Sequence, residues 1–67
     1  MNNTLDLHRV RHEEVDRLVE NFILLNEPPM RIITGNSDKM RKLVGNVLER
    51  HDMSWENFIP SQMTILK

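Results

Sequence analysis

The sequence contains no cysteine, so neither a disulfide bond nor a thiolate-bound zinc ion can hold the fold together. It also has only two glycines and three prolines in 67 residues, with 28% charged residues, which excludes fibrous and low-complexity chains. The fold must therefore be stabilised by packing or by self-association. The lack of cysteine fits a reducing compartment, and we expect a cytoplasmic protein.

Long apolar runs are also missing, and the longest is Phe22–Leu25. A membrane helix needs roughly 20 apolar residues, and Met1–Thr4 show no basic region leading into an apolar stretch, so we expect neither a membrane segment nor a targeting segment. The net charge of −1 gives no general attraction to phosphate backbones. Any nucleic-acid site must therefore be local.

The first half of the chain alternates between strand and helix patterns. Residues 4–8 have the period of a half-buried strand, with Leu5 and Leu7 on one face and Asp6 and His8 on the other. An amphipathic helix is predicted over residues 11–26, ended by Pro28-Pro29. The run 30–34 is nearly all apolar and β-branched, which predicts a central strand. The expected core stripe of the helix is Val15, Leu18, Val19, Phe22 and Leu25.

The second half begins with turn residues, Gly35-Asn36-Ser37. A second helix is predicted over residues 38–51, capped by Asn36 or Ser37. Two short strands are expected around residues 57–59 and 63–66, joined through a turn at 60–62. The expected core stripe of this helix is Met40, Leu43, Val44, Val47 and Leu48.

The predicted order is βαβαββ within one domain, residues 1–67. The first β-α-β unit is long enough for a right-handed crossover between parallel strands. We therefore expect an α/β fold, more narrowly an α+β two-layer sandwich, with a mixed four-stranded sheet and two helices on one face.

Parallel pairing of the first two strands would bring distant polar residues to one edge of the sheet, where ligands usually bind in open parallel sheets. Asp6 and His8 end the first strand, and the turn from Thr34 to Ser37 follows the second. The carboxylate can orient a nucleophile or bind a cation, and the imidazole can move a proton. A polar strand face without chemistry remains the alternative.

The glycine turn opens a helix, whose first amides lack partners and carry partial positive charge. A phosphate could dock there, although the turn could also be a simple strand-to-helix connection with an N-cap. His8 and His12 have an i,i+4 spacing used in some metal sites, but they straddle a strand-to-helix junction, so we assign no metal ligands and leave a divalent metal open as a cofactor. A local basic patch, with scattered solvated charges as the alternative, would comprise Arg9, Arg11, Arg31, Lys39, Arg41 and Lys42.

Leu5-Asp6-Leu7-His8, followed by an amphipathic helix and then by Arg31-Ile32-Ile33-Thr34-Gly35 opening a second helix, resembles the Smr (small MutS-related) domain pattern. Family members carry Leu-Asp-x-His on the first strand and Thr/His-Gly-x-Gly after the second. The resemblance covers nearly the whole chain. It implies a fold similar to the C-terminal domain of a bacterial translation initiation factor.

The resemblance further implies nicking or endonuclease activity on DNA or RNA, with Asp6 and His8 as the first motif and Thr34 and Gly35 as the second. The chain departs from the pattern at Ser37, which replaces the second glycine of that motif, at Arg9, which replaces a glycine common after the histidine, and in its abbreviated C-terminal region.

Ser37 can replace glycine where φ is negative, and its hydroxyl can then cap the helix or bind phosphate. Arg9 adds a cation that can hold a phosphate or repel a protonated His8. The alternative to an enzyme is a binding module for nucleic acid or for protein, and we keep a homodimer or a ribosome or repair complex open as the assembly. The residues expected to contact nucleic acid are Arg9, Arg11, Thr34, Gly35, Asn36, Ser37, Lys39, Arg41 and Lys42.

Overall fold

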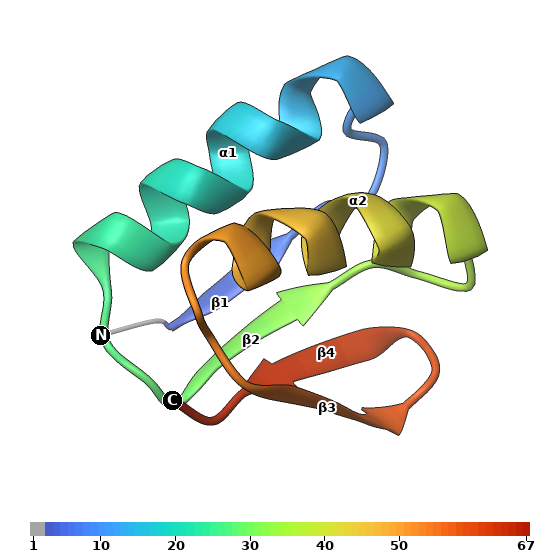
Figure 1. Ribbon diagram of the computed structural model, residues 1–67. Coiled ribbons are helices and arrows are strands. Elements are labelled where there is room, and N and C mark those ends of the chain that lie inside the picture. Colours follow the sequence, from blue (N-terminus) through green and yellow to red (C-terminus); the bar gives the residue numbers. More distant parts are fainter. Residues whose placement is uncertain (1–2) are drawn as a thin grey trace.

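Two helices pack on one face of a mixed four-stranded sheet in the computed structural model, which describes residues 3–67 (Figure 1). The predicted α+β two-layer architecture is confirmed. The elements are β1 (Thr4–Asp6), α1 (His12–Leu25), β2 (Met30–Ile33), α2 (Asp38–Arg50), β3 (Trp55–Ile59) and β4 (Gln62–Ile65).

The strand order is β1-β2-β4-β3, with β1 and β2 parallel and the other two pairs antiparallel. Strand β2 is therefore central, as its β-branched run predicted. Asp6 pairs with Ile33, and Ile33 pairs with Gln62 across the next ladder. The carboxyl ends of β1 and β2, the N-terminal end of α2 and the turn between β3 and β4 thus lie on one side of the molecule (Figure 1).

The first strand is shorter than predicted, because a tight turn follows it directly. The N–H of Val10 donates to the carbonyl oxygen of Leu7 at 3.1 Å, and Arg9 has a φ of 63°. A β-turn with a positive φ at its third residue is a conformation that favours glycine. His8 therefore lies in this turn and not in the strand.

The predicted core stripe of α1 is wrong at its end. Val15, Val19 and Ile23 are buried, whereas Leu25 is 82% exposed. The three buried residues follow the i,i+4 spacing that keeps side chains on one helix face, while Leu25 lies about 200° further around the helix than Ile23. Leu18 and Phe22 pack at the border of the core.

The core stripe of α2 agrees with its prediction. Met40, Val44, Val47 and Leu48 are buried and Leu43 packs beside them. They share one core with the buried side chains of the sheet, which are Met30, Ile32, Met63 and Ile65, and with Leu7 just after β1. Trp55 covers Gly45, where an added Cβ would lie 3.4 Å from the indole ring. The residues of the other sheet face, including Asp6 and Arg31, are more exposed.

Candidate functional site

The side chains of Asp6 and His8 form a pair at the end of β1. The Oδ1 atom of Asp6 accepts a hydrogen bond from the backbone N–H of His8 at 2.9 Å and lies 3.0 Å from the Nδ1 atom of its ring. The backbone hydrogen bond from His8, helped by its ring, lowers the pKa of the Asp6 carboxyl below its usual range. A carboxylate at Nδ1 favours the tautomer with its hydrogen on that atom, which leaves Nε2 as an acceptor.

The free ring nitrogen of His8 faces the glycine turn. A Cβ built on Gly35 would lie 3.7 Å from His8 Nε2, so two residues separated by 27 positions are neighbours in space. Gly35 has a φ of 69°, a backbone conformation that glycine adopts without a steric penalty. The parallel pairing of β1 and β2 therefore brings the pair and the turn together, as the sequence predicted.

The glycine turn is fixed to the β3–β4 hairpin through one carbonyl group. The backbone N–H groups of Thr34 and Gly35 donate to the carbonyl oxygen of Ser61 at 2.8 and 3.1 Å, and the Thr34 hydroxyl donates to it at 3.3 Å. Thr34 is only 5% exposed. Its side chain thus supports the turn from inside and does not present itself to a ligand.

Arg41 completes this connection. Its Nη1 atom donates to the carbonyl oxygens of Pro60 at 2.6 Å and Gly35 at 3.3 Å, while Nη2 contacts Asp38. Arg41 was expected to contact nucleic acid, but these partners give its guanidinium a role in holding the turn. Pro60 and Ser61 were not among the expected site residues, because they contribute through backbone carbonyls and no side-chain motif signals such a role.

The N-terminus of α2 combines a capped amide with free ones. Ser37 has a φ of −100°, and its hydroxyl accepts a hydrogen bond from the N–H of Met40 at 3.1 Å. Ser37 is therefore the N-cap of α2, one of the two candidates that the sequence predicted. Within residues 3–67, the backbone N–H groups of Asn36, Asp38 and Lys39 donate no hydrogen bond to the protein, and these amides can face an anion.

The other residues expected to contact nucleic acid are all exposed, but one of them has an ion-pair partner. Arg9, Asn36, Lys39 and Lys42 are exposed and lie in or beside the two turns. Arg11 is exposed but has Glu13 as an ion-pair partner at 3.7 Å.

The position of Arg31 and two absences complete the description of the expected features. Arg31 lies at the beginning of β2 opposite Thr4, at the far end of that strand from Gly35. Residues 3–67 contain no group of three or more His, Asp or Glu side chains arranged to hold a metal ion. Nor does this described part include a helix long and apolar enough to cross a membrane.

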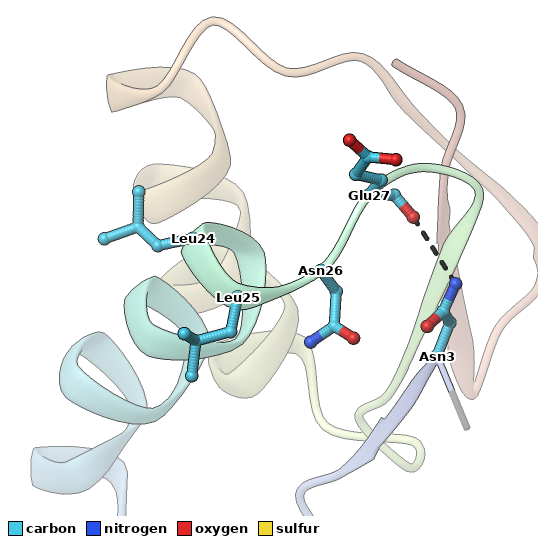
Figure 2. A pocket seen from close by; sticks show the side chains of 5 residues that line it. All are labelled: Asn3, Leu24, Leu25, Asn26 and Glu27. Atoms are coloured by element: carbon cyan, nitrogen blue, oxygen red, sulfur yellow. Dashed lines mark hydrogen bonds between the residues drawn. The ribbon is translucent and has the colours of Figure 1, made fainter. Parts of the chain in front are cut away.

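A shallow pocket lies at the other end of the molecule, beside the C-terminal end of α1 (Figure 2). The side-chain amide of Asn3 donates to the carbonyl oxygen of Glu27 at 3.4 Å, and the exposed Leu24 and Leu25 form the apolar part of the lining. Only Glu27 among these residues can titrate. This pocket therefore offers no acid–base pair of the kind found at the end of β1.

No family model, curated protein or solved structure matches the chain.

Proposed function

We propose that the edge formed by the Asp6–His8 pair and the Gly35 turn cleaves phosphodiester bonds in DNA or RNA, as the resemblance to Smr domains implies. The observation that carries this proposal is the position of His8 Nε2, which faces Gly35 while Asp6 holds the opposite ring nitrogen. A base oriented by a carboxylate and directed at a glycine turn with free amides suits phosphoryl transfer.

Each group has a defined part in the reaction. A phosphate bound at the amides of Asn36, Asp38 and Lys39 would place its phosphorus near His8. The Nε2 atom takes a proton from an attacking water molecule as the water oxygen bonds to phosphorus. The bond to the leaving oxygen breaks and that oxygen takes a proton from water, while the imidazolium returns its proton to the hydroxide that remains. The amides balance the charge that develops on the phosphoryl oxygens, while Asp6 stabilises the imidazolium.

The positive side chains near the edge support nucleic acid as the substrate. Arg9, Lys39 and Lys42 are exposed, and none of them has an ion-pair partner within residues 3–67. Cations close to an anion-binding helix terminus add affinity for a phosphate backbone. The net charge of −1 confines this attraction to the edge. On this basis we propose DNA or RNA as its partner; the cytoplasm is the location we propose from the lack of cysteine.

A binding module without catalysis is the second candidate. The side chains of His8 and Asp6 are 66% and 59% exposed, so water surrounds the pair. Charge stabilisation in a transition state is strongest where water is excluded. The same edge could therefore hold nucleic-acid ends, alone or within a ribosome or repair complex, without cleaving them.

One experiment that measures both cleavage and binding distinguishes the two candidate functions. Labelled RNA and DNA are incubated with the wild type and with Asp6→Asn, His8→Ala and His12→Ala, each with and without EDTA. His12 is a matched control, because it is an exposed histidine outside the pair. Catalysis predicts cleavage by the wild type and His12→Ala, with losses of at least about a hundredfold in His8→Ala, consistent with the ~10²–10⁴-fold effect of a general base.

Other outcomes contradict catalysis. Cleavage that persists in His8→Ala would come from another group or a contaminant. Salt-sensitive binding without any cleavage would establish the binding module. A protein that neither cleaves nor binds the labelled RNA and DNA would be explained by the third possibility, a protein-interaction domain.

A further inference from the structure

The end of β3 lies on the same side of the molecule as the candidate site and is held there. The carbonyl oxygens of Ser61 and Pro60 accept hydrogen bonds from Gly35 and Arg41. The two residues before this turn, Phe58 and Ile59, are the last of their strand. Their position relative to the glycine turn is therefore fixed by the fold and not by a free loop.

Phe58 exposes an aromatic ring at this place. The ring residue is 70% exposed and Ile59 is 46% exposed, whereas Phe22 and Trp55 pack against the core. The chain has only these three aromatic residues. Of these three residues, only Phe58 is largely open to solvent; it lies on the outer strand opposite β1, at the same end of the sheet as the Asp6–His8 pair.

The register gives the separation between Asp6 and Ile59, the residue that directly follows Phe58. Asp6 pairs with Ile33, Ile33 with Gln62, and Gln62 with Ile59. Three strand spacings of 4.7–4.9 Å make this row about 14 Å long. A short stretch of unstacked strand could cross that distance with its phosphate at the glycine turn and a base at Phe58.

We propose that Phe58 is a stacking platform for an unpaired base, so that the substrate class of the site is single-stranded or locally unpaired nucleic acid. This inference rests on the proposed function and specifies its substrate. Aromatic side chains that stack successive bases are a general device for holding single strands, because every base presents a flat face. A base inside a duplex is already stacked and cannot use the ring.

The surroundings of Phe58 disfavour a protein partner. The ladder between β3 and β4 shifts register between Glu56 and Ile59, and such a bulge spoils an edge strand as a template for pairing. The apolar surface comprises the side chains of Phe58, Ile59 and Pro60, whereas a stable protein interface needs about 800 Å² from each partner. A flat base fits a surface of this size.

Binding to three probes tests the proposal. The probes are a single-stranded oligonucleotide, the same backbone with abasic positions, and a blunt duplex, each labelled for fluorescence anisotropy and checked for integrity afterwards. The proteins are the wild type, Phe58→Ala and Phe58→Trp. Leu25→Ala is the matched control, because it removes a more exposed apolar side chain at the far end of the molecule.

We expect Phe58→Ala to weaken binding of the base-bearing single strand about tenfold, within the ~1–3 kcal/mol that stacking contributes per base. Binding of the abasic strand and the duplex should stay unchanged, Phe58→Trp should retain affinity, and Leu25→Ala should match the wild type. Equal losses on all probes, or no loss on any, would overturn the stacking proposal while leaving the proposed function. A concentration-dependent dimer that Phe58→Ala abolishes would assign the ring to a protein interface. Wild-type protein that binds no probe would overturn both proposals.

Discussion

Replacing Arg9 by glycine should stabilise the protein, because its backbone is in a conformation that a β-carbon opposes. The φ of Arg9 is 63°, in the left-handed region, where a residue with a β-carbon loses about 1–2 kcal/mol. Glycine avoids this loss but has more conformational entropy to lose on folding, about 0.5–1 kcal/mol. The difference favours Arg9→Gly by about 0.5–1 kcal/mol. In a domain of this size that raises Tm by about 2–8 °C.

Arg9→Ala is the control that isolates the backbone effect. It removes the guanidinium, as glycine does, but keeps the β-carbon, so it should unfold within about 0.5 kcal/mol of the wild type. A second control is Asp52→Gly. Asp52 has a φ of 54°, but aspartate tolerates the left-handed region better than arginine does, so the gain should be smaller.

The measurement is thermal and urea unfolding of all four proteins, monitored by far-ultraviolet circular dichroism. Equal midpoints for Arg9→Gly and Arg9→Ala would refute the reasoning, because the turn would then hold no strain that glycine relieves. In the nucleic-acid assay the two variants should lose affinity equally, since both lack the cation. The use of the Arg9 side chain in binding would then explain why the chain keeps an arginine at a strained backbone position.

Three further outcomes are expected. Ser37→Ala should lower the free energy of unfolding by about 1 kcal/mol in urea titrations, because Met40 loses the acceptor for its N–H, whereas Ser37→Gly should cost only a few tenths. The pKa of Asp6 is lowered on folding, so its carboxylate stabilises the protein above its unfolded pKa and loses that effect as pH falls through the folded pKa. The Tm of Asp6→Asn should therefore approach that of the wild type in acid. Tm values of the two proteins that stay equally far apart at every pH would contradict this. Gly35→Ala should cost about 1 kcal/mol of stability yet abolish cleavage, because its methyl group would occupy the space 3.7 Å from His8 Nε2; retained cleavage in folded protein would show that no phosphate binds there.

The elements could be predicted because their signals are local. Alternation located β1, the β-branched run located β2, and the turn residues narrowed the cap of α2 to Asn36 or Ser37. The burial of Ile23 in place of Leu25 was missed because Phe22–Leu25 are all apolar, so any of them could belong to the buried face of the helix. Only contact with the sheet selects one of them.

The convergence of Asp6, His8 and Gly35 could also be predicted, because it follows from one parallel strand pair. The roles of Thr34 and Arg41 could not. Both depend on the hairpin turn lying beside Gly35, which requires β4 to pair with β2. Two short β-prone segments carry no information on which of them takes that place. An arginine near a proposed phosphate site then suggests a phosphate ligand, although Nη1 of Arg41 donates to backbone carbonyls and Nη2 donates to Asp38.

The hydrogen bonds of the site separate the groups that shape it from those that can react. The Gly35 N–H, the Thr34 hydroxyl and the Arg41 guanidinium all have protein partners, and a ligand would have to break these bonds to use them. His8 Nε2 and the amides of Asn36, Asp38 and Lys39 would lose nothing comparable. Since a buried donor that is left without a partner costs more than a hydrogen bond contributes, an anion should bind the second set. The Thr34-Gly35 motif would then serve the site by holding that set in position.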